Sequence, residues 1–248
     1  MQDGRASETA RRVAAQRLTF DRLSGTGDQA ADEAADEALH RDVADGFAWE
    51  PTPMTRYLAA RTRFFDAAVV DWSGPQVVAL GAGYDGRSLR YAGPRWWELD
   101  HPATQADKLA RLERLGIRPS AVFVAADFLV DDWTLPGHDP ALPTLFLCEG
   151  VLAYLPAPDR LLRWAAAVAA PGSQLAVEVP VTGKASSTGA QVRATAAGVG
   201  EPMAEPWERA GLRARLSSYG WSLSSAVDAR GTPIEESDLT AALVTART

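Results

Sequence analysis

The sequence predicts an α/β fold in which a parallel sheet carries helices on both faces. Three observations support this prediction: short apolar runs alternate with helical stretches from residue 75 onward, the first run ends in glycine, and acidic residues directly follow several later runs. An apolar run that ends in glycine is typical of a buried parallel strand before a tight turn. Because parallel strands need long crossover connections, their alternation with helices indicates one sheet covered on both sides.

The first 75 residues are predicted to be mainly helical. Apolar residues recur at helical spacing over 5–23 and 53–70, whereas the acidic stretch 24–50 is typical of a solvated helix face or a mobile segment. The following pattern predicts strands at 76–80, 95–99, 121–126, 144–148 and 174–179, with helices at 101–116 and 158–172. After residue 180 we expect an irregular stretch, a helix near 206–218, and strands at 221–227 and 239–245.

The composition excludes several classes of protein. A net charge of −7 argues against a nucleic-acid partner, because phosphate binding needs a basic surface. The single cysteine, Cys148, rules out an internal disulfide framework, and no apolar run approaches the length of a membrane span. The polar first residues do not resemble a signal peptide. We therefore expect a cytoplasmic protein that acts on a small molecule, and the sequence leaves its oligomeric state open.

The stretch LGAGYDGRS at 80–88 has the glycine spacing of a dinucleotide-binding loop. Gly81 and Gly83 end the first strand, where the backbone turns tightly and can approach a ligand, and Gly86 completes the spacing. Asp100 ends the second strand, 19 residues after Gly81, where a carboxylate can accept both hydroxyl groups of a ribose. These features fit NAD and S-adenosylmethionine (SAM) equally well, and a turn without a ligand also fits.

Three further features favour SAM over NAD. About 75 residues precede the first strand, whereas NAD-binding domains often begin near it. Asp85 lies within the glycine loop, where it would repel the two charges of a pyrophosphate but would suit a sulfonium and an ammonium group. Asp127 and Glu149 follow the third and fourth strands, so that with Asp100 one carboxylate follows each of three successive strands. Such a group of carboxylates suits a cationic cofactor.

Arg61 lies within an apolar stripe of the helix expected at 53–70. A charged side chain on a buried stripe needs a partner, so Arg61 is expected either to bind an anion or to form a structural ion pair. Tyr154 could line the same cleft or belong to the core. No residues have metal-ligand spacing, so no metal is expected. Three histidines are expected at the surface rather than in catalysis, although the second could stack near an adenosine: His40, His101 and His138.

Four separated stretches, RYLAARTRFFD, VVALGAGYDGR, ELDHP and LCEGVLAYLP, resemble the leucine carboxyl methyltransferase family. That family includes many bacterial SAM-dependent O-methyltransferases, some of which act on polyketide intermediates. The resemblance implies a class I SAM-dependent methyltransferase fold: a Rossmann-like sheet of seven strands whose last strand is antiparallel, with a helical cap. It also implies a cap segment at 1–52, a SAM-binding domain at 53–248 and a cap insertion around 181–212. The chain departs from the family at Gly86, where threonine is usual, and lacks the family's Asp-Pro segment near the N-terminus.

The resemblance also implies roles for individual residues. The glycine loop would pack against the amino-acid part of SAM, Asp100 would bind the ribose, Asp127 and Phe128 the adenine, and Glu149 the amino group. Arg61 would lie at the cofactor carboxylate or at the substrate, and the expected catalytic residues are Arg61 and Tyr154. The expected cofactor-binding residues are Arg61, Gly81, Ala82, Gly83, Asp85, Asp100, His101, Asp127, Phe128, Glu149 and Gly150.

Together these patterns predict a SAM-dependent O-methyltransferase with a small-molecule acceptor, with secondary metabolism as an expected setting. A carboxylic acid is already anionic at pH 7, whereas a phenol has a pKa of about 10 and usually needs a general base. Because no histidine is expected where the sheet edge meets the cap, a carboxylate acceptor is favoured over a hydroxyl acceptor. The alternatives are an NAD(P)-dependent oxidoreductase and a non-catalytic SAM-binding protein.

Overall fold

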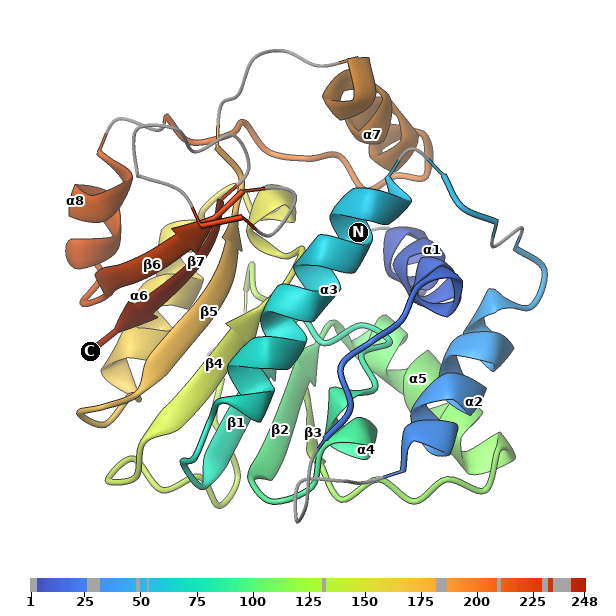
Figure 1. The fold of residues 1–248 in the computed structure, drawn as a ribbon, viewed down its shortest axis with the longest axis horizontal. Helices are drawn as coiled ribbons and strands as arrows, with labels where there is room; N and C mark the ends of the chain where they lie inside the picture. The colour runs from blue at the N-terminus through green and yellow to red at the C-terminus, as the bar shows by residue number, and fades with distance from the viewer. Residues whose placement is uncertain are drawn as a thin grey trace.

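The strands form one seven-stranded sheet in the order β3–β2–β1–β4–β5–β7–β6 (Figure 1). β7 is antiparallel to both of its neighbours, whereas the strands paired between β3 and β5 are parallel, so the predicted sheet with an antiparallel last strand is confirmed. The computed structural model describes residues 4–25, 32–47, 50–52, 54–130, 133–181, 187–208, 211–228, 232–233 and 242–248. The strands are β1 (Gln76–Leu80), β2 (Arg95–Asp100), β3 (Val122–Ala125), β4 (Thr144–Cys148), β5 (Gln174–Val179), β6 (Ser222–Val227) and β7 (Ala242–Arg247).

Helices cover both faces of the sheet, and further helices lie beyond its β2–β3 side (Figure 1). On one face Val77 of β1 packs in a cluster with Phe65 of α3. On the other face Val78 packs in a cluster with Leu161 of α6 and Leu216 of α8. The helices are α1 (Glu8–Gln16), η1 (Arg17–Thr19), α2 (Glu33–Ala44), α3 (Thr55–Val70), α4 (Arg87–Arg90), α5 (Pro102–Arg114), η3 (Leu152–Tyr154), α6 (Pro158–Ala167), α7 (Ser187–Gly198) and α8 (Leu212–Ser217).

β1 is apolar along most of its length because both faces of the sheet are covered. All five of its residues are buried, as expected for a central parallel strand. The strand ends at Leu80 and leads directly into the glycine loop, so the packing of the core fixes the position of that loop at the carboxyl edge of the sheet.

The acidic stretch 24–50 contains a buried helix, which corrects the prediction of a solvated or mobile segment. α2 places Ala35, Leu39 and Val43 at intervals of four residues, and all three are buried in a cluster with Tyr84 of the glycine loop. The apolar face is narrow and partly alanine, which is why the surrounding acidic residues dominate the sequence pattern. Residues 26–31 and 48–49 of this stretch lie outside the described residues.

The C-terminal third differs from the prediction in detail. α7 occupies part of the stretch expected to be irregular, and α8 is shorter than the helix expected near 206–218. β6 agrees with the expected strand at 221–227, whereas the first three residues of the strand expected at 239–245 lie outside the described residues. Within the described part of the chain, no helix is both long enough and apolar enough to cross a membrane.

Candidate functional site

The glycine loop lies where the strand order of the sheet reverses. β1 has β2 on one side and β4 on the other, and ligands of open α/β sheets bind at such a switch point. Gly81 and Gly83 have φ angles of +67° and +51°, which residues with side chains rarely adopt. A Cβ atom on Gly81 would lie 2.3 Å from Cγ2 of Val151. The N–H groups of Gly81 and Ala82 donate to the Leu99 carbonyl at 2.8 and 3.0 Å, which holds the loop against β2.

Asp100, the last residue of β2, accepts two backbone hydrogen bonds. The Gly83 N–H donates to Oδ2 at 2.5 Å, and the His101 N–H donates to Oδ1 at 2.7 Å. Burial raises the pKa of Asp100 to about 6, against the opposing effect of these hydrogen bonds. Each carboxylate oxygen can accept a further hydrogen bond, so Asp100 can receive hydroxyl groups while it holds the loop. His101 caps α5, because its Nδ1 accepts from the Ala103 N–H at 3.3 Å.

Asp127 and Phe128 follow β3 at the same edge. The Ala126 N–H donates to the Asp100 carbonyl at 2.8 Å, which ties this segment to the end of β2. Oδ1 of Asp127 accepts from the Leu129 N–H at 2.9 Å, and the Phe128 ring lies edge-on to a neighbouring tryptophan ring at 5.1 Å. Asp100 and Asp127 therefore follow adjacent strands of the sheet, whereas β1 lies between β2 and β4, the strand that precedes Glu149.

Glu149 follows β4, and three guanidinium groups converge on its carboxylate. Arg61 Nε and Arg17 Nη2 donate to Oε1 at 3.0 and 3.2 Å, and Arg87 Nη1 donates to Oε2 at 2.7 Å. Burial alone would raise the pKa of Glu149, but Arg87, Arg17 and Arg61 lower it to about 2. The carboxylate is therefore charged at neutral pH and stands next to the glycine loop.

Asp85 lies in the glycine loop, where Arg87 compensates its charge. Its Oδ1 accepts from the Arg87 N–H at 2.9 Å, and its Oδ2 accepts from Arg87 Nη1 at 2.7 Å. Arg87 is fully buried and also donates to Asp66 Oδ1 at 2.7 Å and to the Thr62 carbonyl at 3.1 Å. The sequence argument treated Asp85 as an uncompensated charge, whereas the structure places it in a network of ion pairs. Its role toward a cofactor stays a prediction.

The same network reaches the N-terminal segment. Arg22 donates to Asp66 Oδ1 at 3.1 Å and to Asp36 Oδ2 at 2.6 Å, and Arg90 donates to the same Asp36 oxygen at 3.3 Å. Asp66 is fully buried on α3, so Arg61 is not the only buried charge of that helix. Buried charges that lose a partner are strongly unfavourable, so these pairs fix α2 and α3 relative to the glycine loop.

Arg61 is buried, as predicted, and joins two carboxylates from neighbouring strands. Its Nε donates to Glu149 and its Nη1 donates to Oε2 of Glu178 on β5 at 3.0 Å. The Tyr57 hydroxyl donates to the other oxygen of Glu178. Gly150, with a φ angle of +70°, lies beside this group, because a Cβ there would lie 3.4 Å from Arg61 Nη1. Arg61 therefore has the ion-pair partners that the sequence analysis required.

Tyr154 lies between this group and the N-terminal segment. Burial raises its pKa, and its electrostatic neighbours include Arg61, Glu178 and Glu201, with Thr9 as a hydrogen-bond partner. The half-buried side chain thus lies near charged groups rather than in a purely apolar core. Its assignment as a catalytic residue stays a prediction.

Glu201, which follows α7, holds the first turn of α1. Its carboxylate accepts from the Ser7 hydroxyl at 3.0 Å, from the Glu8 N–H at 2.8 Å and from the Thr9 hydroxyl. A carboxylate at a helix N-terminus is favourable because free N–H groups and the helix dipole both point toward it. The segment after β5 and the N-terminal helix are therefore joined above the carboxyl edge.

Residues of this site that were not predicted include Arg17, Arg87, Glu178 and Glu201. Arg17 is buried, and its Nε has no hydrogen-bond partner within the described residues. Glu178 had a usable signal, because it is a charge inside the apolar run LAVEV, just as Glu149 follows the run TLFLC. Arg17 lies in the helix predicted at 5–23 and Glu201 in a stretch expected to be irregular, and only the fold shows their partners.

His40 is buried, which corrects the expectation of a surface position. Its Nε2 lies 3.1 Å from the Tyr84 carbonyl oxygen, and its Nδ1 lies 3.4 Å from Oδ1 of Asp36. Burial lowers its pKa to about 4, against the effect of Asp36, so the ring is neutral at pH 7. His138 is half-buried near the start of β4, where its Nε2 lies 2.9 Å from Thr144 Oγ1.

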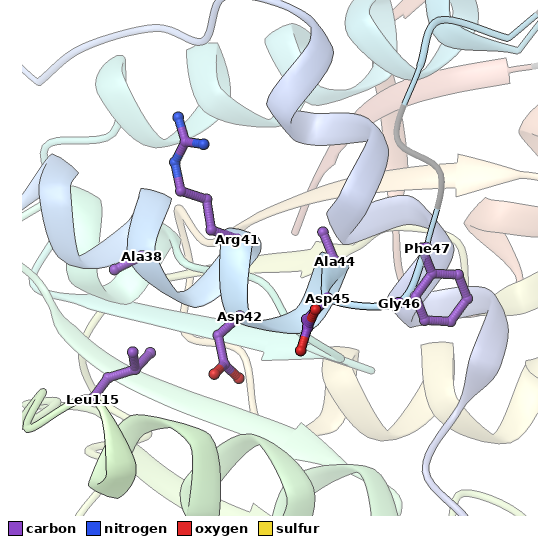
Figure 2. Close-up of a pocket in the computed structure, with 8 residues that line it drawn as sticks. All are labelled: Ala38, Arg41, Asp42, Ala44, Asp45, Gly46, Phe47 and Leu115. Atoms are coloured by element: carbon purple, nitrogen blue, oxygen red, sulfur yellow. The ribbon is translucent and has the colours of Figure 1, made fainter.

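An open hollow of about 590 Å³ lies apart from these residues, beside the C-terminal half of α2 (Figure 2). Asp42 on its wall is already paired with Arg111 and Arg114, both at 2.7 Å. None of its lining residues belongs to the predicted site: Ala38, Arg41, Asp42, Ala44, Asp45, Gly46, Phe47 and Leu115. Over the described ranges, no group of three or more histidine, cysteine or acidic residues could hold a metal ion.

Comparison with known families agrees with this geometry. The model of the leucine carboxyl methyltransferase family matches residues 3–166, which is more than half of the chain. The chain belongs to the leucine carboxyl methyltransferase family. A relative from Mycobacterium sp. (strain KMS), provisionally named an S-adenosyl-L-methionine-dependent methyltransferase, is 39% identical over 170 residues, which cover 64% of this chain and 54% of the relative. A relative of the same provisional name from Mycolicibacterium smegmatis is 38% identical and covers 71% of this chain and 60% of the relative. The chain thus spans little more than half the length of these curated relatives.

Solved structures share the fold at low sequence identity. A protein of Thermobifida fusca YX, provisionally named a methyltransferase, has a TM-score of 0.62 at 15% identity and covers 100% of this chain and 96% of its own. Magnesium protoporphyrin IX methyltransferase from Synechocystis PCC 6803, solved with bound S-adenosylhomocysteine (SAH), has a TM-score of 0.52 at 15% identity and covers 84% and 92% of the two chains. These likenesses show that the fold is that of the class I methyltransferases.

Proposed function

We propose that this chain is a SAM-dependent O-methyltransferase that acts on a hydroxyl or carboxylate group of a small molecule. The observation that carries this proposal is the placement of Asp100 and Glu149 at the ends of β2 and β4, on either side of a loop in which Gly81 leaves no room for a side chain. Membership of the leucine carboxyl methyltransferase family supports it. Secondary metabolism and a cytoplasmic location are further proposals, which rest on the resemblance and the composition.

The residues of the edge fit the chemical groups of SAM. Asp100 can accept from ribose hydroxyls, and Glu149 offers a charged carboxylate for the amino group. Arg17 offers a cation for the carboxylate, and its Nε has no partner among the residues that the structure describes.

When bound, SAM supplies a methyl group that is already activated by its sulfonium. The protein then has to hold cofactor and acceptor in line and keep water away, which accounts for most of the rate in such a transfer. We propose that residues 1–52 and the insertion around 181–212 form the cap that does this. The contact between Glu201 and the first turn of α1 supports this division.

A thermal-shift measurement tests the cofactor assignment. SAM and SAH should raise the melting temperature of the purified protein, whereas NAD+ and NADP+ should leave it unchanged. Stabilisation by NAD(P) alone would favour the oxidoreductase alternative. Stabilisation by SAH without transfer of labelled methyl to any acceptor would favour the non-catalytic alternative. Activity, where found, is expected to survive EDTA.

A further inference from the structure

We propose that Glu178 receives the proton of a hydroxyl acceptor, and that the site thereby selects hydroxyl groups over carboxylates. This inference rests on the proposed O-methyltransferase function and names its acceptor class. It reverses the order of acceptors that the sequence favoured, because the structure supplies a base that the sequence analysis did not consider.

The position of Glu178 places it on the acceptor side of the site. β4 and β5 are parallel neighbours with Cys148 opposite Val177, so Glu149 and Glu178 come next on the two strands. The proposed cofactor contacts lie at the ends of β2, β3 and β4, which leaves the end of β5 for the acceptor. Arg61 bonds both carboxylates at 3.0 Å, so the two groups border one space.

The Glu178 carboxylate has capacity for one more donor. The Tyr57 hydroxyl donates to Oε1 and Arg61 donates to Oε2, and each carboxylate oxygen can accept more than one hydrogen bond. The side chain is 17% exposed, compared with 9% for Glu149. A Cβ on Gly150 would lie 3.7 Å from Glu178 Oε2, so the glycine keeps the approach to this oxygen open.

The charges around this space disfavour an anionic acceptor. The titratable groups around Glu178 are Tyr57 and Arg61 from α3, Cys148 at the end of β4, Tyr154 from η3, and Glu149, which shares Arg61 with Glu178. Among the described side chains, Arg61 is the one cation within ion-pair distance of Glu178, and it is already shared with Glu149. An acceptor carboxylate beside Glu178 would therefore meet the negative charge of Glu178, and the cation there is already shared, whereas the charge of Glu149 is compensated by further arginines. A neutral hydroxyl can donate to Glu178 instead.

The transfer step balances with this assignment. The acceptor oxygen forms a bond to the methyl carbon while its O–H bond breaks, and the proton passes to the Glu178 carboxylate. The bond between the methyl carbon and sulfur breaks, and its electron pair stays on sulfur. The products are a methyl ether and SAH, and Glu178 then releases its proton to water. Tyr57 and Arg61 hold the carboxylate in position through this step.

Matched pairs of isomers test this proposal. Methyl 4-hydroxybenzoate carries a free hydroxyl and 4-methoxybenzoate carries a free carboxylate, yet methylation converts both to the same product. The same pair of groups on naphthalene and on a linear aliphatic chain completes the panel. By calorimetry on the SAH-bound protein, the hydroxyl isomer of at least one pair should bind at least tenfold more tightly than its carboxylate isomer. Glu178→Gln should reduce that preference, because it removes the negative charge.

Turnover gives a second readout. Glu178→Gln should lower kcat for the hydroxyl isomer by about 100-fold or more, the usual effect of losing a general base. Its remaining rate should rise with pH and should recover on phenols that carry electron-withdrawing nitro groups, because these ionise without a base. The kcat of Glu178→Asp should lie between those of the wild type and Glu178→Gln. The kcat of Glu113→Gln, an exposed change on α5, should match that of the wild type.

Each result decides between the proposals. Tighter binding of the carboxylate isomers by the wild type would overturn the inference. So would a loss of kcat in Glu178→Gln that is equal for all phenols, with and without nitro groups. SAH binding with no transfer of labelled methyl to either isomer of any pair would instead count against the O-methyltransferase function. SAH binding to the variant at wild-type affinity shows that its cofactor site is folded.

Discussion

Arg17 Nη2 lies 3.2 Å from Oε1 of Glu149, although 132 residues separate the two in the sequence. This contact joins the N-terminal segment to the end of the central strand β4. Within the described residues, Arg17 donates one side-chain hydrogen bond and its Nε has no partner, whereas Arg61 donates two such bonds. It is therefore the arginine best able to turn toward the carboxylate of a bound cofactor.

Replacement of Arg17 should weaken SAH binding through that carboxylate. Arg17→Met should raise the Kd of SAH by about 10-fold to 100-fold, since a hydrogen bond to a charged group contributes about 1.5–3 kcal/mol. The Kd of 5′-methylthioadenosine, which lacks both amino-acid charges, should stay unchanged. Arg12→Met on the exposed side of α1 is the control. If calorimetry shows that Arg17→Met raises the Kd of both ligands equally, Arg17 acts on the fold rather than on the cofactor.

Cofactor binding should depend on pH through Asp100. Burial raises the pKa of this carboxyl to about 6, and its charged form is the better acceptor for ribose hydroxyls. The Kd of SAH should therefore be flat above pH 7 and increase about tenfold for each unit below pH 6. Asp100→Asn should bind more weakly at all pH values and lose this dependence. A wild-type Kd that does not change between pH 5 and 7 would remove Asp100 from the ribose contact.

Alanine variants at two glycines with similar φ angles can distinguish the effect of backbone strain from that of close packing. Gly81 and Gly116 have φ angles of +67° and +70°, so alanine at either costs about 1–2 kcal/mol of strain. At Gly116 a Cβ would meet nothing within 4 Å, whereas at Gly81 it would lie 2.3 Å from Val151. Gly116→Ala should keep SAH affinity, and Gly81→Ala should lose it. Similar SAH affinities in the two folded variants would show that the Gly81 position is not a close approach.

Among the arginines of this network, Arg87 should cause the largest loss in the free energy of unfolding when it is replaced. It is fully buried and donates to Asp66, Asp85 and Glu149, so Arg87→Met leaves three carboxylates short of a partner. Breaking a buried pair costs about 3–5 kcal/mol, whereas an exposed pair contributes at most about 1 kcal/mol. Urea unfolding of Arg87→Met should show a loss in that range, with Arg41→Met as the exposed control. A loss below about 1 kcal/mol would mean that the network rearranges without Arg87.

The sequence predicted the sheet well because its strands are apolar runs with glycine or acidic residues at their ends. Glu149 was identified for that reason, since a charge directly after four apolar residues marks a strand end. Glu178 carries the same signal, but Val179 follows it, so the charge appeared to lie within a strand. The prediction of its importance required the register between β4 and β5, which no local pattern contains.

The N-terminal segment was the least predictable part. α2 buries small alanines and one charged residue, Asp36, whose partners Arg22 and Arg90 come from two other segments. A buried acidic residue looks the same in sequence as a solvated one, because only the distant arginines distinguish the two. The same limit applies to Arg17 and to the position of His40.

The contact of Glu201 with the first turn of α1 also has a consequence for biosynthesis. Ser7 and Glu201 are separated by 194 residues, so α1 leaves the ribosome long before the carboxylate that caps it has been synthesised. Contacts between such distant residues form late in folding, because the intervening chain must first be ordered. The first five strands can therefore form while the first turn of α1 still lacks this carboxylate. Growing chains that stop before residue 201 should be cleaved by protease more readily at the first turn of α1 than chains that extend past it.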